Sequence, residues 1–120
     1  MEEIKVAGEN AQFIVIRLGQ EQYGIDISYI ENIVRMQHIT RGPKLAPYLK
    51  GVINLRGEVI PIMCLSMKMG LPVEEETKAS RIIIIKMEQC GTLGLIVDEV
   101  KEVVTLDMTE QVEKLAFKKE

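Results

Sequence analysis

The sequence contains little of the chemistry on which most enzymes and metal proteins depend. His38 is the only histidine among the 120 residues, so the chain alone cannot assemble a histidine-based metal cluster or a Ser-His-Asp triad. The two cysteines, Cys64 and Cys90, lie in or beside strand-like runs without metal-ligand spacing, which predicts structural thiols in a reducing compartment. Gly91 and Gly94 fall inside a predicted hairpin, so they do not form a phosphate-binding loop. We therefore expect no catalytic residues, no metal and no cofactor.

Long apolar runs are also missing. No segment approaches the roughly 20 apolar residues that cross a bilayer, and residues 1–5 lack the basic-then-apolar order of a signal peptide. These absences predict a cytoplasmic protein without direct membrane insertion. Aromatic residues make up only 4% of the chain, whereas proteins that bind single-stranded nucleic acid usually stack bases on aromatic side chains. The composition thus gives little support to nucleic-acid binding.

What remains is the composition of one ordinary globular domain. Apolar residues account for 47% of the chain and charged residues for 28%, and a chain of this length buries about two-thirds of its unfolded surface. The net charge is only −3, but no acid occurs between residues 32 and 57, which hold five bases: Arg35, Arg41, Lys44, Lys50 and Arg56. Residues 98–113 hold six acids and a single lysine. We therefore expect one positive and one negative surface, which would orient protein partners.

Three pairs of apolar, β-branched runs, each interrupted by a short turn, predict β-hairpins over residues 13–27, 52–64 and 81–97. The continuous isoleucines from Ile82 to Ile85 predict a strand buried on both faces. Pro61 predicts an edge strand or a bulge, because proline cannot donate to a β-ladder. A further strand is expected over residues 100–106. Short strands with few helices between them favour an all-β barrel or sandwich.

Two short helices are expected between the hairpins. Ser28 and Glu31 have the spacing of a capping box, and the apolar residues that accompany them recur at helical intervals, which predicts a helix over residues 27–34. A second helix of one or two turns is predicted over residues 66–69, where Gly70 and Pro72 stop it.

The segment Lys50-Gly51-Val52-Ile53-Asn54-Leu55-Arg56-Gly57-Glu58-Val59-Ile60-Pro61-Ile62 closely resembles the signature of the CheW-like family. Similar segments occur in family order at residues 13–18, 23–27, 70–72 and 94–100. The resemblance covers a domain over residues 12–106, with a flexible lead over 1–11 and a weakly helical or frayed tail over 107–120. It implies two small five-stranded β-barrels packed together.

The resemblance also implies a function and partners. Members of the family are non-enzymatic adaptors of bacterial chemotaxis that couple the cytoplasmic tip of a methyl-accepting chemoreceptor to the histidine kinase CheA, whose regulatory domain they bind. By position in the family pattern, the receptor-interface candidates are Ile30, Glu31, Asn32, Arg56 and Gly57. The kinase-interface residues are unknown from the sequence.

Two positions depart from the family pattern. Asn32 stands where many members carry glutamate, and Glu31 precedes it by one residue. A carboxylate is therefore still present but would point in a different direction, so we expect receptor pairing to differ. Cys64 stands where aspartate is usual, which removes a hydrogen-bonding carboxylate.

The strands that close the family's fold do not follow Leu106, so we expect an incomplete barrel at the C-terminal side. The open edge is expected beside the strands that contain Ile82–Ile85 and Leu93–Val97, and an unpaired edge invites another chain. A strand-exchanged homodimer is the favoured cover, and a helix over residues 109–118 is the alternative.

Two other functions compete with the adaptor interpretation. The first is a small β-barrel that binds single-stranded nucleic acid through the basic stretch 35–56, which the scarcity of aromatic residues disfavours. The second is a small enzyme, which is disfavoured because His38 has no evident acid or nucleophile beside it.

Overall fold

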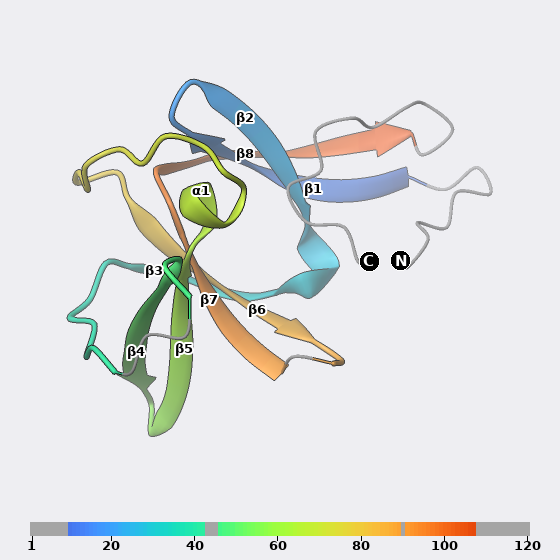
Figure 1. Cartoon of the computed structure of the whole chain (residues 1–120). Helices are drawn as coiled ribbons and strands as arrows, with labels where there is room; N and C mark the ends of the chain where they lie inside the picture. Colours follow the sequence, from blue (N-terminus) through green and yellow to red (C-terminus); the bar gives the residue numbers. More distant parts are fainter. Residues whose placement is uncertain (1–9, 43–45, 90, 108–120) are drawn as a thin grey trace.

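The computed structural model describes residues 10–42, 46–89 and 91–107, and within them β-strands dominate (Figure 1). In chain order the elements are β1 (Asn10–Leu18), β2 (Glu21–Asp26), the 3-10 helix η1 (Ile27–Tyr29), β3 (Ile30–Arg35), β4 (Leu49–Leu55), β5 (Glu58–Cys64), α1 (Leu65–Lys68), β6 (Arg81–Met87), β7 (Gly91–Val97) and β8 (Glu99–Asp107). The predicted all-β class is confirmed. The predicted helix over 66–69 is present as α1, shifted by one residue.

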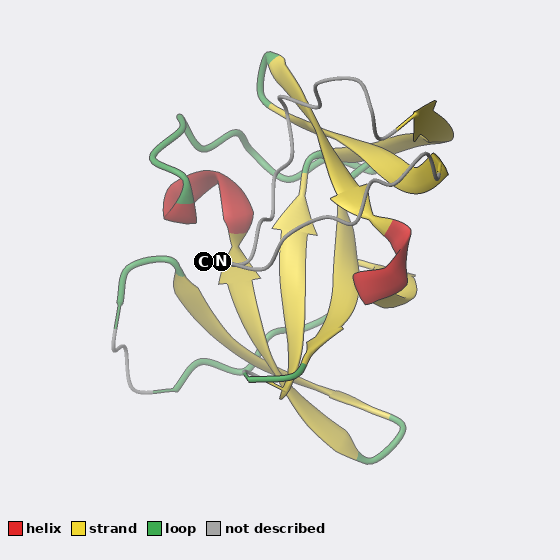
Figure 2. Ribbon diagram, turned by 90° about the vertical axis from the view of Figure 1, so that its right-hand side faces the viewer, coloured by secondary structure: helices red, strands yellow, loops and turns green. Residues whose placement is uncertain are grey.

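The strands form two sheets, and Figure 2 shows the smaller one above the larger one. The three-stranded sheet has the order β2-β1-β8, and the five-stranded sheet has the order β3-β6-β7-β5-β4. The three predicted hairpins are confirmed as β1–β2, β4–β5 and β6–β7. The strand expected after residue 100 is β8, which pairs antiparallel with β1, while β5 and β7 run parallel to each other.

Order begins earlier in the chain than predicted. Asn10 and Ala11 pair with Asp107 and Leu106 of β8, so the predicted flexible lead is wrong at its last two residues. Asp107 likewise belongs to a strand rather than to the tail. The rest of the lead and of the tail, including the helix predicted over 109–118, lies outside the described residues.

β6 joins the two halves of the core. Each isoleucine from Ile82 to Ile85 is at most 1% exposed, and alternate side chains of a strand point to opposite faces. Two of them pack in one cluster with Ile16 and Ile25 of the small sheet, and the other two pack in a second cluster with Ile53 and Ile60. Full burial of such a side chain stabilises a fold by roughly 1.5–3 kcal/mol. The predicted strand buried on both faces is confirmed.

The two edge strands of the large sheet are joined beyond the end of β3. The N–H of Thr40 donates to the carbonyl of Val52 at 2.8 Å, and the N–H of Val52 donates to the carbonyl of Thr40 at 2.9 Å. Because Thr40 follows β3 and Val52 lies in β4, this bridge closes the sheet on itself, as a barrel requires. Gly51 permits the approach: its φ is 141°, and a Cβ there would lie 2.8 Å from the carbonyl carbon of Thr40.

The helix predicted over residues 27–34 is wrong. Only η1 is helical, its cap is Asp26, whose Oδ1 accepts the N–H of Ser28 at 2.9 Å, and the next six residues form β3. A short apolar run fits both a helical and a strand pattern. Here the β-branched side chains of Ile33 and Val34 pack on the sheet beside β6, and this tertiary packing decides in favour of the strand.

The open edge is also not where the sequence placed it. The strands that contain Ile82–Ile85 and Leu93–Val97 are both interior, with β6 between β3 and β7 and β7 between β6 and β5. Within the described residues, the edges of the small sheet are β2 and β8 instead. Pro61 is likewise on an interior strand, but the ladder between β5 and β7 begins only at Ile62. The missing N–H of Pro61 therefore falls where β5 has no partner on the β7 side.

A group of polar contacts fixes the junction of β7 and β8 against the β1–β2 turn. The N–H of Asp98 donates to the carbonyl of Arg17 at 3.0 Å, and its Oδ2 accepts the N–H of Gly19 at 2.6 Å. Nε of Arg17 donates to Oε1 of Glu99 at 2.9 Å. The Arg17 hydrogen bond, helped by the charge of Lys101, holds the pKa of Glu99 below its ordinary value of 4.5.

The barrel closure predicts an order of stability among glycine substitutions. Gly51→Ala should lower the free energy of unfolding by about 2–4 kcal/mol, because the new Cβ meets backbone and the φ is unfavourable for a side chain. Gly94→Ala should cost less, about 1–2 kcal/mol, because its φ is not positive and its nearest neighbour is the end of the Ile62 side chain, Cδ1, rather than backbone. Gly42→Ala, with open space around the site, is the control. Urea denaturation measures all three, and a Gly51→Ala cost no larger than that of Gly42→Ala would contradict the closure.

The Glu99 contact predicts a dependence of stability on acid. A carboxyl whose folded pKa is depressed stabilises the fold above its unfolded pKa and loses that contribution as pH falls through the folded pKa. Glu99→Gln should therefore be less stable than the native chain at pH 7, with a difference that shrinks below about pH 4.5. Thermal unfolding from pH 7 to pH 3 measures this difference. Glu102→Gln, on the same strand and without an ion pair among the described residues, should show no such convergence, and equal profiles for both variants would reject the contact.

Candidate functional site

The predicted interface residues lie at one end of the five-stranded sheet. Ile30, the first residue of β3, pairs with Ile85 near the end of β6, so β3 starts at the end of the sheet that carries the β6–β7 turn. The β4–β5 turn, formed by Arg56 and Gly57, lies at the same end, because β5 runs parallel to β7. The register thus places both groups of candidates toward one end of the sheet, on separate strands. No hydrogen bond or ion pair joins the two groups within the described residues.

The β4–β5 turn has a backbone that suits glycine better than arginine. Both turn residues have positive φ, 54° at Arg56 and 83° at Gly57, as in the type I′ turns of tight hairpins. Oδ1 of Asn54 accepts the N–H of Gly57 at 3.1 Å and supports the turn. Arg56 is the only non-glycine residue with positive φ among the described residues. A strained position that keeps a long cationic side chain points to a role for that side chain beyond the turn.

The surface beside Arg56 combines charge with exposed apolar area. Arg56 is exposed and makes no ion pair within the described residues. Val59 is 60% exposed, and Pro61 is exposed on the same face of β5. An arginine beside accessible apolar side chains has the composition of a protein interface, where arginine and apolar anchors supply much of the binding energy.

The second group of candidates lies on β3, where a bulge decides which side chain is presented. The pairing of β3 with β6 shifts between Ile30 and Asn32, so Glu31 is the extra residue, and bulges commonly redirect a side chain. Glu31 is exposed, with Oε2 4.0 Å from Nζ of Lys86. Oδ1 of Asn32 instead accepts the N–H of Ile33 at 2.8 Å. Glu31 therefore places an exposed carboxylate on the surface of this strand.

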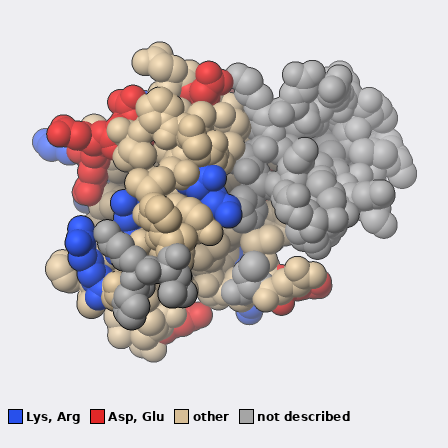
Figure 3. All heavy atoms as spheres, in the orientation of Figure 1, with Lys and Arg blue, Asp and Glu red and all other residues tan. Residues whose placement is uncertain are grey.

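The predicted charge surfaces are divided differently from the expectation. Figure 3 shows acidic side chains along the upper edge of the drawn face, basic side chains below them, and further acidic side chains at the lower edge. Arg35 is the last residue of β3, and Lys50 is the second residue of the edge strand β4, so these bases lie at the end of the sheet opposite to Arg56. The predicted positive surface is thus split between the two ends. Lys44 lies outside the described residues. On the acidic side, Asp98 and Glu99 are already engaged by hydrogen bonds.

The sequence did not reveal a cavity at the end of the sheet opposite to Arg56. Its volume is about 290 Å³, and its walls come from segments far apart in the chain. The lining residues have only one feature in common, their position near strand ends at one end of the sheet. This feature can be recognised only when the strand order is known. Within the described part of the chain, no group of three or more His, Cys, Asp or Glu residues could hold a metal ion, and no helix is long and apolar enough to cross a membrane.

Comparisons with known proteins match this architecture. A model of the CheW-like domain family matches residues 12–119. The chain is 38% identical over 99 residues to the chemotaxis protein CheW of Bacillus subtilis, an alignment that covers 82% of this chain and 63% of that protein. It is 34% identical over 102 residues to the chemotaxis protein CheW of Helicobacter pylori, with coverage of 85% and 61%.

A solved structure agrees with these matches. The crystal structure of the scaffolding protein TtCheW from Thermoanaerobacter tengcongensis superposes with a TM-score of 0.77 and 36% identity, over 82% of this chain and 67% of that one. The chain spans less than two thirds of the length of the two curated relatives named above. The strand order, the barrel closure and the family match over most of the sequence together establish that this chain belongs to the CheW-like domain family.

Proposed function

We propose that the chain is a non-enzymatic adaptor of bacterial chemotaxis that couples the cytoplasmic tips of methyl-accepting chemoreceptors to the regulatory domain of the histidine kinase CheA, in the cytoplasm. The observation that carries the proposal is the family match over residues 12–119. It is supported by relatives that are named as chemotaxis proteins and by a structural neighbour that is named a scaffolding protein. A nucleic-acid-binding barrel is not proposed, because Arg35 and Lys50 lie at one end of the sheet and Arg56 lies at the other, rather than in one groove.

The proposed receptor interface is centred on Arg56 and Gly57, with Ile30, Glu31 and Asn32 on β3 as its second part. Arg56 supplies an unpaired cation, and Glu31 supplies the carboxylate. The engagement of Asn32 with its own backbone supports Glu31 as the acidic contact. Opposite charges at one end of the sheet would fix the orientation of a helical partner more than they would raise its affinity.

Binding experiments with Arg56 variants test this interface. Calorimetry should detect binding of the native chain to both a soluble receptor-tip fragment and a CheA regulatory domain. Arg56→Asn should weaken receptor binding about 5-fold or more, since loss of a good interface arginine costs more than about 1 kcal/mol. The same variant should unfold at equal or higher denaturant concentration, because a non-glycine residue with positive φ costs roughly 1–2 kcal/mol and asparagine tolerates that backbone better.

Two further variants complete the test of Arg56. Arg56→Lys keeps the positive charge and should retain part of the receptor affinity, whereas Arg56→Glu should abolish it. Receptor affinity that is unchanged in Arg56→Asn would assign the arginine to the turn alone. Absence of binding to both partners by the native chain would reject the adaptor function itself.

We also propose that the chain forms a homodimer through an edge of the small sheet, as a strand exchange or strand addition. β8 is nine residues long, pairs only with β1 among the described residues, and carries Val103 with 51% exposure. A long edge with exposed apolar side chains favours pairing with a second chain.

The oligomeric state can be measured directly. Size exclusion with light scattering at micromolar concentrations should give the mass of a dimer, and Val103→Lys should shift the population toward monomer, because a charged side chain on an edge strand opposes pairing. Lys101→Glu, which leaves the edge charged, is the control. A monomer at every concentration would reject the dimer.

A further inference from the structure

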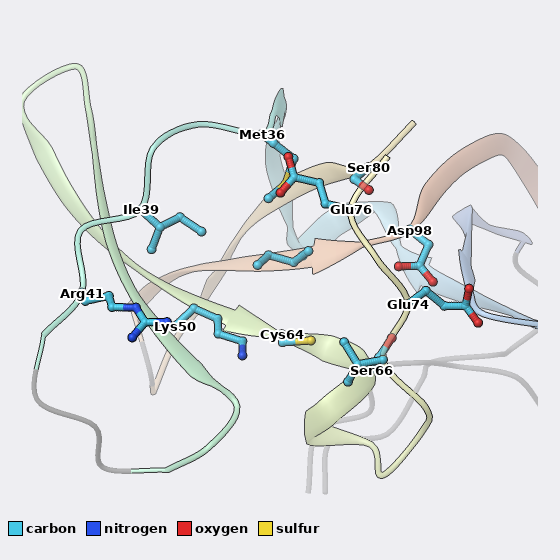
Figure 4. A pocket seen from close by; sticks show the side chains of 12 residues that line it. Met36, Ile39, Arg41, Lys50, Cys64, Ser66, Glu74, Glu76, Ser80 and Asp98 are labelled. Carbon is cyan, nitrogen blue, oxygen red and sulfur yellow. The ribbon is translucent and has the colours of Figure 1, made fainter. Parts of the chain in front are cut away.

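The cavity at the end of the sheet opposite to Arg56 has an apolar floor (Figure 4). Met36 and Ile39 come from the connection that follows β3, Cys64 ends β5, and Ile96 lies in β7. Val73, on the loop between α1 and β6, completes the rim and is 54% exposed. The volume of about 290 Å³ is close to the lower limit of ligand pockets, about 300 Å³. An exposed valine at the rim of an apolar hollow gains by being covered.

The walls of the cavity carry opposite charges. Arg41 and Lys50 stand together on one side in Figure 4, Glu74 stands on the other side, and Glu76 lies between them at the top of the view, beside Met36. None of these four side chains forms an ion pair within the described residues. Asp98 also lines the cavity, but its Oδ2 already accepts the N–H of Gly19. The cavity therefore offers two cations and two carboxylates that have no ion-pair partner among residues 10–42, 46–89 and 91–107.

A mostly buried hydroxyl, without a hydrogen-bond partner in the described part of the chain, also faces the cavity. Ser66, at the start of α1, is 3% exposed and lines the cavity, and no hydrogen bond engages its side chain among the described residues. Every fully enclosed side-chain nitrogen or oxygen atom in the described residues does have a partner. The hydroxyl of Ser66 must therefore reach the space of the cavity, where it can bond to an occupant.

We propose that this cavity binds an extended segment of a partner protein in which an acidic and a basic side chain flank one or two apolar residues. The acidic side chain lies between Arg41 and Lys50, the basic side chain meets Glu74 and Glu76, and the apolar residues cover Val73 and the floor. The backbone or a polar side chain of the segment bonds to Ser66. A nucleic acid or an anionic membrane would meet the carboxylates of Glu74 and Glu76 with like charge, which disfavours both. The site is separate from the receptor interface proposed above, so either can fail without the other.

The experiment selects ligands from a phage-displayed library of 12-residue peptides on the full-length chain carrying Cys90→Ser, which leaves Cys64 as its single thiol. We expect enriched peptides to carry an acidic and a basic residue around an apolar centre. A synthetic copy of an enriched peptide, at saturation, should slow the alkylation of Cys64 by N-ethylmaleimide at least 10-fold, because Cys64 lines the cavity. Lys50→Glu should weaken the binding of this peptide at least 10-fold.

Matched variants separate the cavity from general charge effects. Arg56→Glu makes the same change of charge at the other end of the sheet and should leave peptide affinity unchanged. Lys50→Gln, a milder change, replaces Lys50→Glu if the latter does not fold, and should weaken binding at least 3-fold. The proposal is overturned if no peptide is enriched, if enriched peptides lack either charge, if they leave the alkylation rate of Cys64 unchanged, or if both Lys50 variants bind them as the native chain does.

Discussion

The burial of one strand on both of its faces is the constraint on which the rest of the structure depends. β6 places alternate isoleucines into the two core clusters, so the small sheet and the large sheet are held by the same four residues. A strand in this position needs neighbours on both sides, and β3 and β7 supply them. The remaining elements then have little freedom. β5 pairs with β7, β4 pairs with β5, and the connection after β3 returns to β4 through Thr40.

Local features were readable from the sequence, and long-range features were not. The hairpins were predictable because their turns are short and their runs are β-branched, and the burial of Ile82–Ile85 was predictable because a fully apolar strand needs cover on both faces. The strand at β3 was missed because its apolar residues fit both periodicities, and only the neighbouring β6 decides between them. The bulge at Glu31 depends on the same pairing. No pattern in the sequence predicts that β5 and β7 run parallel or that Thr40 forms a bridge with Val52.

The topology separates two chemically different ends of one barrel. The β4–β5 and β6–β7 turns and the start of β3 form one end, with Arg56 and Glu31, while the cavity with its opposed charges forms the other end. The sequence alone did not show this division, because Lys50 and Arg56 are only six residues apart, yet Lys50 lies near the start of β4 and Arg56 lies in the turn that follows its end. An adaptor needs surfaces that do not obstruct each other, and a small closed barrel supplies two of them on a rigid support.

The pairing of β1 with β8 has a consequence for the folding of the chain during translation. Phe13 pairs with Val104, a residue that is translated about 90 positions later. At synthesis rates of about 5–20 residues per second, β1 waits roughly 5–20 s for this partner. During that interval the β1–β2 hairpin carries Ile14, Ile16 and Leu18 without the strand that completes its sheet. The five-stranded sheet is incomplete for nearly as long, because its last strand, β7, ends only seven residues before Val104. The nascent chain therefore has unpaired strand edges in both sheets until its last strands are translated, and during this period pairing with other chains has to be prevented.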